Sequence, residues 1–170
     1  MKYGHDPNFK FAMARSIYKS ILQFISYSHK ESYAVQPLAP EKFSITTKSN
    51  GKAVLRWSPC DDMREPTAKA TSYNVYIATN NSGFDNGNNT KNTKYEIPLE
   101  PGVLYRFKVT ACNSGGESFP TEELAALYNP KASDNILIVN GFHRLSGPAV
   151  VDNGSQQGFD LNADAGVSYG

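Results

Sequence analysis

The sequence predicts a mainly β protein built around a sandwich of two antiparallel sheets, and three observations support this. Between residues 41 and 128, short segments alternate apolar and polar side chains, which is the period of a strand with one buried face. Turn-forming Gly, Pro and Asn residues separate these segments. The chain also contains 10 Tyr and 9 Phe, residue types that favour strands. Short strands divided by turns are typical of a sandwich.

The overall composition limits the classes of function. A chain of 170 residues, of which 39% are hydrophobic, can form one compact core with additional segments. The net charge of +1 gives no strong field for nucleic acid or an anionic membrane. Because the chain has no apolar run of about 18 residues, we expect no membrane span. The first residues, MKYGHDPNFK, lack the apolar centre of a secretory signal.

Residues 6–29 form the first expected element, an amphipathic helix. Asp6 is a suitable N-cap, and Pro7 suits the first helical position. One apolar stripe follows helical spacing and contains Ala14, Ile17, Tyr18, Ile21, Leu22 and Ile25. We expect this stripe to pack on the following domain, on another chain or on a domain outside this sequence, because a lone helix is marginal in water. Residues 31–40 contain two prolines and no periodicity, so they form an extended linker.

The expected strands of the sandwich follow in order. They cover residues 42–48, 52–58, 71–79, 93–99 and 103–112, with a last edge strand within 118–128. Two polar connections, 59–70 and 80–92, separate the second strand from the third and the third from the fourth. We expect residues 129–170 to be the incomplete start of a further domain, in which the apolar run 136–142 resembles a buried strand.

The segment LEPGVLYRFKVTAC, residues 99–112, explains how one end of the sandwich closes. Tyr105 stands at the head of a strand, directly after the turn formed by Pro101 and Gly102. A tyrosine there packs its ring on the edge of the core, while its hydroxyl bonds to the backbone a few residues upstream. We expect Leu99 to be buried beside it.

Residues 36–128 resemble a fibronectin type III domain. The resemblance rests on Trp57 at the end of the second strand, on SYNVY with Tyr73 and Val75, and on LEPGVLYRFKVTACNSGGES. It implies an immunoglobulin-like sandwich of about seven strands, in which Trp57, Tyr73, Leu99 and Tyr105 are structural residues.

The flanking segments resemble other families. Residues 9–25 are similar to the closing helix of a zinc-dependent N-acetylmuramoyl-L-alanine amidase domain, whose zinc ligands would precede residue 1. Residues 135–152 and 158–167 are similar to the start of the domain that follows a fibronectin type III module in secreted Bacteroidetes proteins, often labelled xanthan lyase or amidase. These similarities imply a fragment of a larger enzyme that acts on peptidoglycan or polysaccharide. They also imply a secreted, periplasmic or cell-surface location.

The sequence contains no complete catalytic or metal-binding set. His5, His29 and His143 lack metal-ligand spacing, so we expect solvated or structural histidines and no metal or cofactor. DLNADAG, residues 160–166, places Asp160, Asn162 and Asp164 at alternate positions, as a calcium loop does. However, Ala165 stands where such a loop needs glycine, which favours a polar loop.

Two further groups leave alternatives open. Asp61, Asp62 and Glu65 could form an acid pair, but a solvated loop is the favoured reading because no nucleophile accompanies them. Cys60 and Cys112 are expected at the same end of the sandwich, where they form either a disulfide or two unpaired thiols.

Tyr76 and Phe84 are the candidate ligand-binding residues. Exposed aromatic rings stack on sugars, although packing of Tyr76 on a neighbouring strand and anchoring of the loop by Phe84 is the favoured alternative. Our main functional hypothesis is a non-catalytic spacer or accessory module whose partners are adjacent domains of the same polypeptide. The alternative is a module that binds glycan, peptidoglycan or protein, and the third is an enzyme complete in itself.

Overall fold

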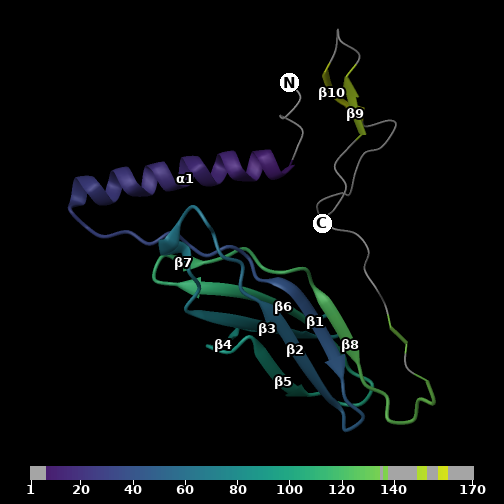
Figure 1. Ribbon diagram of the computed structural model, residues 1–170. Coiled ribbons are helices and arrows are strands. Elements are labelled where there is room, and N and C mark those ends of the chain that lie inside the picture. Colours follow the sequence, from purple (N-terminus) through teal and green to yellow (C-terminus); the bar gives the residue numbers. More distant parts are fainter. Residues whose placement is uncertain (1–6, 135, 138–148, 153–156, 161–170) are drawn as a thin grey trace. The chain divides into compact units, whose positions relative to one another are not determined.

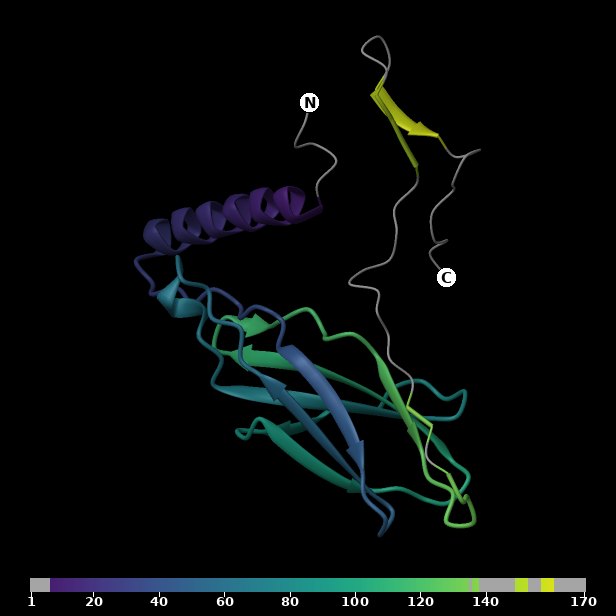
Figure 2. The same cartoon turned by 45° about the vertical axis from the view of Figure 1, so that its right-hand side comes forward.

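The computed structural model describes residues 7–134, 136–137, 149–152 and 157–160 (Figures 1 and 2). The chain divides into two compact units, Ile17–Ser133 and a unit made of both chain ends, Met1–Ser16 and Asp134–Gly170. The first unit contains the sandwich, the segment before it and the C-terminal half of the helix. The candidate functional site lies in this unit.

Two antiparallel sheets form the sandwich, as the sequence predicts. The first sheet has the order β1-β2-β5 and consists of β1 (Glu41–Thr47), β2 (Lys52–Ser58) and β5 (Lys94–Pro98). The second has the order β4-β3-β6-β7, with β8 also paired to β6. Its strands are β3 (Ser72–Thr79), β4 (Asn88–Thr90), β6 (Leu104–Asn113), β7 (Gly116–Glu117) and β8 (Leu124–Leu127). The sandwich therefore has eight strands.

Two of these strands were not predicted. The short strand β4 lies within the Asn/Gly-rich connection 80–92, and β7 has only two residues. Asn-Asn-Thr has low intrinsic strand preference, so β4 forms because β3 offers a partner, with Tyr73 opposite Thr90 and Val75 opposite Asn88. A single turn of 3-10 helix, η1 (Pro66–Ala68), interrupts the connection 59–70.

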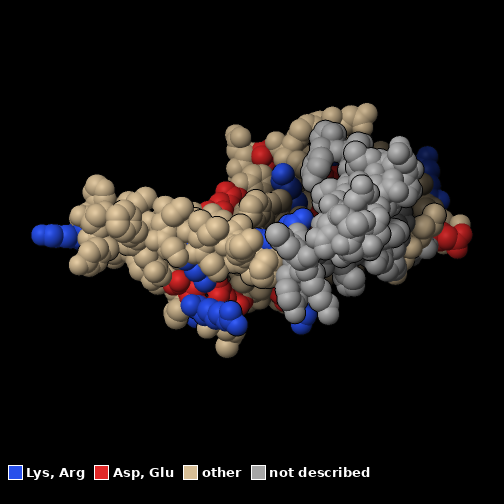
Figure 3. Space-filling view, turned by 90° about the horizontal axis from the view of Figure 1, so that it is seen from above, with Lys and Arg blue, Asp and Glu red and all other residues tan. Residues whose placement is uncertain are grey.

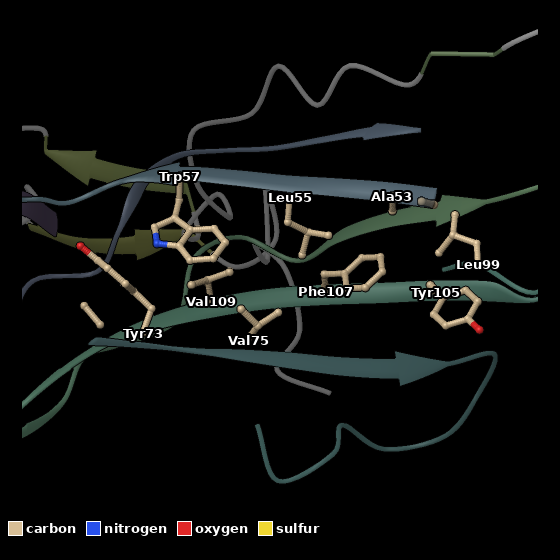
Figure 4. Packing of buried hydrophobic residues seen from close by; sticks show 11 residues of the cluster. Ala53, Leu55, Trp57, Tyr73, Val75, Leu99, Tyr105, Phe107 and Val109 are labelled. Carbon is tan, nitrogen blue, oxygen red and sulfur yellow. The ribbon is translucent and has the colours of Figure 1, made fainter. Parts of the chain in front are cut away.

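The core lies between the sheets, where the alternating residues of β2, β3 and β6 meet (Figure 4). Phe107 is fully buried at its centre, and its ring stacks on that of Tyr105 with centroids 6.1 Å apart. At the other end, Trp57 meets Tyr73 edge-on at 5.5 Å. Such aromatic pairs add to the stability that the buried apolar area provides.

The turn between β1 and β2 needs a glycine. Gly51 has a φ of +75°, and a Cβ there would lie 2.8 Å from the ring of Tyr128. The hydroxyl of Tyr128 donates a hydrogen bond to the carbonyl oxygen of Ser49 at 3.2 Å. The Tyr128 ring, just after β8, therefore covers the turn between β1 and β2.

The corner before β6 has a buried tyrosine and a buried leucine. Tyr105 is 7% exposed and Leu99 6% exposed. The Tyr105 hydroxyl accepts a hydrogen bond from the backbone N–H of Glu100 at 3.4 Å, five residues upstream. The bond is long, so its contribution to stability lies at the lower end of the range for hydrogen bonds.

Replacing Tyr105 by phenylalanine is expected to lower the free energy of unfolding by about 1 kcal/mol. The ring stays buried, and the Glu100 N–H loses one acceptor near the surface, where water replaces it. Equilibrium urea unfolding with an unchanged m-value measures the effect. A loss of about 3 kcal/mol or more would show that the corner depends on this hydroxyl far more than the bond length indicates.

Helix α1 (Pro7–His29) ends in a well-formed C-cap. The Lys30 N–H donates to the carbonyl oxygen of Tyr27, and the Glu31 N–H donates to that of Ser26. Lys30 has a φ of +57°. This is the Schellman pattern, with lysine where glycine is commonest.

Only part of the predicted apolar stripe of α1 is covered, since Tyr18 and Leu22 are half-buried and its other members are exposed. Ile17, Ile21 and Ile25 are 56%, 54% and 48% exposed, and Phe24 is 72% exposed. The helix instead turns its Tyr18, Lys19 and Ser26 flank inward, because Lys19 pairs with acidic residues of the connection 59–70. Seen from above, the C-terminal half of α1 therefore shows a largely uncharged surface (Figure 3).

The C-terminal region departs from the predicted buried strand. Ile136 and Leu137 are 91% and 83% exposed and belong to no strand, while residues 138–142 of the same run lie outside the described residues. Further on, β9 (Ala149–Asp152) and β10 (Gln157–Asp160) pair antiparallel, which the sequence pattern did not predict.

Candidate functional site

The segment between α1 and β1 is the best-defined feature outside the core. It has no helix or strand, as predicted, but it is held on the sandwich and is not a free linker. The Val35 side chain is fully buried, and Pro37 is less than 2% exposed. We call residues 33–37, together with the groups that hold them, the linker junction.

Asn113, the last residue of β6, holds the linker junction together. Its side-chain amide donates to the carbonyl oxygens of Val35 at 2.8 Å and Thr67 at 3.0 Å, and lies 3.4 Å from that of Lys69. The backbone N–H of Val35 donates to the Thr67 hydroxyl at 3.2 Å. Both backbone polar groups of Val35 are therefore bonded, as burial of this residue requires.

The turn after Asn113 fits the linker only because it contains Gly115. A Cβ built on Gly115 would lie 2.1 Å from the carbonyl oxygen of Ala34 and 2.6 Å from its carbonyl carbon. These are backbone atoms, which cannot move aside as a flexible side chain does. The Gly115 N–H also donates to the Asn113 side-chain oxygen at 2.8 Å. The turn and the linker therefore pack closely against each other, with no space for a side chain at Gly115.

The C-terminal half of α1 joins this arrangement through charge. Lys19 Nζ lies 2.8 Å from Asp62 Oδ2 and 4.0 Å from Glu65 Oε2. Glu65 also accepts a hydrogen bond from the Thr67 hydroxyl at 2.6 Å. The expectation of a merely solvated loop is therefore wrong for Glu65, which is 6% exposed. The reason is that the helix supplies the cation that balances its charge.

A shallow hollow of about 180 Å³ lies beside these acids, lined by Asp61, Asp62, Glu65, Pro66 and Lys69. In the part of the chain that the structure describes, no three His, Cys, Asp or Glu side chains are placed to hold a metal ion. The Lys19 ammonium group pairs with both Asp62 and Glu65, so the hollow has the chemistry of a structural junction.

Tyr76 and Phe84, the predicted ligand-binding residues, lie together on the outer face of the second sheet. Both rings are half-buried. Lys108 Nζ lies 4.3 Å from the Phe84 ring centroid and 5.5 Å from that of Tyr76, and Arg106 also approaches Phe84 at 5.4 Å. The two rings are therefore in contact with the protein's own cations, and Phe84 fixes the connection 80–92 to the sheet.

Glu117 completes this outer-face cluster. It accepts a hydrogen bond from the Tyr76 hydroxyl at 2.6 Å and a short one from Thr110. Burial raises the pKa of Glu117, but hydrogen bonds from Thr110 and Tyr76 and the charge of Lys108 outweigh it, so the net pKa is lowered. The bond to Glu117 also raises the pKa of Tyr76.

Replacing Glu117 by glutamine is expected to make the sandwich less sensitive to acid. Because folding lowers the pKa of Glu117, its stabilising contribution is present above the unfolded value of 4.5 and is lost as the pH falls through the folded value. Urea unfolding between pH 6 and pH 3 would show a shallower fall in the glutamine variant than in the wild type. Curves of equal slope would contradict this assignment, and Tyr76→Phe should give an intermediate slope.

Where the structure describes the remaining candidate residues, they form no reactive centre. Cys60 and Cys112 are unpaired thiols. Burial and a hydrogen bond to Glu41 raise the pKa of Cys60 to about 11, so the thiol stays protonated at neutral pH and is a poor nucleophile. His29 is the last residue of α1, whereas His5, His143, Asn162 and Asp164 lie outside the described residues.

Trp57, Tyr73, Leu99 and Tyr105, the predicted structural residues, are all buried in the core. Neither α1 nor η1, the helices of the described part of the chain, has the long apolar run that a membrane-spanning helix needs. What sequence reasoning missed is the role of Asn113 and Gly115. An Asn-Ser-Gly-Gly run signals a turn, but nothing local indicates that a segment almost 80 residues upstream packs against it.

Comparison with solved structures found similar chains, and the twitchin match supports the fold. The twitchin kinase region from C. elegans matches with 20% identity and a TM-score of 0.51, covering 59% of this chain and 18% of that one. Titin kinase with its flanking domains matches with 24% identity and a TM-score of 0.48, covering 55% and 17%. The third fibronectin III domain of human KIAA0343 protein matches with 16% identity and a TM-score of 0.47, covering 62% and 92%.

The chain thus spans less than a fifth of the length of the twitchin structure, which contains several domains. The search of curated protein sequences found no match. A family model, described as the fibronectin type III domain, matches residues 38–126, which is more than half of the chain. Together with the eight-stranded sandwich and its buried tyrosine corner, this match shows that the chain belongs to the fibronectin type III family.

Proposed function

We propose that this sandwich is a non-catalytic spacer that fixes the direction in which the preceding segment of its polypeptide leaves it. The observation that carries the proposal is the linker junction, where Val35 is fully buried and Asn113 bonds its carbonyl oxygen. A free linker would leave neighbouring domains to move independently. A linker bonded to the sandwich transmits the orientation of one element to the next.

The same proposal includes the domain limits. Residues 1–30 end a preceding domain, residues 31–40 connect it, residues 41–128 form the fibronectin type III domain and residues 129–170 begin the next one. Proline at positions 37 and 40 restricts the connection further, and Pro37 is among the buried residues.

The parent protein that we propose is a secreted or envelope bacterial enzyme that acts on peptidoglycan or polysaccharide. Support comes from the similarity of residues 9–25 to an amidase helix. It also comes from the similarity of residues 135–152 and 158–167 to the domain after a fibronectin type III module in xanthan lyase-like or amidase proteins. In such a protein, the catalytic residues belong to other domains, and the location is extracellular, periplasmic or on the cell surface.

The purified chain tests the proposal when incubated with peptidoglycan and with xanthan. We expect neither turnover nor retention on either polymer. Residual dipolar couplings of residues 33–37 should fit the same alignment tensor as the strands of the sandwich. Averaged couplings in residues 33–37 would overturn the spacer role. Retention that depends on Tyr76 and Phe84 would favour the alternative, a glycan-binding module, and turnover would show an enzyme.

A further inference from the structure

We propose that Lys19 acts as an ionic latch, holding α1 against the connection 59–70, and that breaking this latch lets the helix pivot while the linker junction stays in place. The proposal rests on the spacer function and concerns its regulation. It follows from a contrast between two attachments within the unit Ile17–Ser133.

The first attachment, at the linker junction, is deeply buried. Val35 is fully buried and its backbone is bonded on both sides, by Thr67 and Asn113. Gly115 packs directly against the Ala34 backbone. Opening this attachment would expose apolar surface and break backbone hydrogen bonds that only the folded sandwich can supply.

The second attachment, between α1 and the sandwich, is largely polar. Lys19 reaches past the linker to Asp62 and Glu65, whereas Tyr18 and Gln23 bond to linker residues, at the Gln36 N–H and the Tyr33 hydroxyl. The apolar residues Ile17, Ile21 and Phe24 are each more than half exposed. Hydrophobic burial, which normally fixes an amphipathic helix, therefore contributes little on this side.

The electrostatics give Lys19 the deciding role. The side chains of Lys19, Asp62 and Glu65 are 18%, 11% and 7% exposed. Without the ammonium group, the Asp62 and Glu65 carboxylates would keep their hydrogen bonds from the Arg64 N–H and the Thr67 hydroxyl, but they would lose the cation that both contact. Two like charges close together in a poorly hydrated place repel each other. Movement of the helix away from the loop relieves this by admitting water.

A pivot is already present between the two attachments. Residues 30–32 are exposed and have no regular structure after the C-cap. Lys30 has a left-handed φ of +57°, a backbone conformation that is unfavourable for a residue with a Cβ. Residues at the end of an element commonly absorb the backbone change in such hinges. Rotation here would carry the helix, with its exposed Ile17, Ile21 and Phe24, to a new direction.

Residual dipolar couplings of backbone N–H groups test the latch in the full chain. In the wild type, residues 17–29 and the sandwich strands should fit one alignment tensor. In Lys19→Glu we expect the couplings of residues 17–29 to shrink at least twofold, while those of residues 33–36 and the strands stay unchanged. If Lys19→Glu folds poorly, the milder variant Lys19→Gln tests the same point, and we expect the same change in its helix couplings.

Two controls make the test specific. Lys91→Glu makes the same charge change at an exposed site between β4 and β5 and should keep a single tensor. The charge exchange Lys19→Glu with Asp62→Lys should restore the helix couplings. Helix couplings that stay at full size in both Lys19 variants would overturn the latch. Averaged couplings in the linker junction of the wild type would instead overturn the spacer function on which the latch rests.

Discussion

Replacing Phe107 by alanine is expected to destabilise the sandwich by about 3–5 kcal/mol. Phe107 is fully buried between the two sheets and stacks on Tyr105, which itself closes the corner before β6. Truncation removes the ring from the core and leaves a cavity that rigid strands on both sides cannot collapse to fill. Since small domains are stable by only about 5–15 kcal/mol, this single change would remove a large part of the total.

Equilibrium unfolding in urea measures the loss, and Phe119→Ala is the matched control. Phe119 is 65% exposed, and the same truncation there should change stability by no more than about 0.5 kcal/mol. A loss below about 1.5 kcal/mol in Phe107→Ala would contradict the central position of this ring in the core. Equal losses of stability in Phe107→Ala and Phe119→Ala would also contradict it.

The sequence predicts the sandwich well because its main strands carry their own signal. In β2, β3 and β6, the inward side chains occupy alternate positions, so the period of two marks both the strand and its buried face. Trp57 and Tyr105 stand at strand ends, where their position reflects the architecture of the family. β4 carries no such signal, since its Asn and Thr residues become a strand only by pairing with β3.

The linker and the helix show why the rest could not be predicted. The sequence around Val35 gives no period, because the residue is buried by contacts with Thr67 and Asn113, which are distant in the chain. The apolar stripe of α1 predicts a buried face, but it does not indicate which surface buries it. Lys19 decides the orientation towards the sandwich, and its partners Asp62 and Glu65 lie more than 40 residues away. The spacing of apolar residues in a sequence indicates local helices and strands, whereas these contacts depend on the complete fold.

Replacing Gly115 by alanine is expected to displace the linker from the sandwich and to lower the free energy of unfolding by about 2 kcal/mol, the order of burying one valine side chain. The added Cβ would stand 2.1 Å from the Ala34 carbonyl oxygen, far inside contact distance. Because both sides of the clash are backbone, either the linker or the turn must move. Asn113, whose side chain bonds both Val35 and the Gly115 N–H, would lose its geometry in either case.

Hydrogen exchange of the Val35 amide measures the displacement, because this N–H bonds to Thr67 only while the linker lies on the sandwich. Gly83→Ala is the matched control, since a Cβ at Gly83 meets no heavy atom within 4 Å. We expect Gly115→Ala to lose most of the protection at Val35, while amides in β3 and β6 keep theirs and Gly83→Ala matches the wild type. Undiminished protection of Val35 in Gly115→Ala would mean that the turn yields instead of the linker. The orientation of the preceding segment would then not depend on how the two fit together.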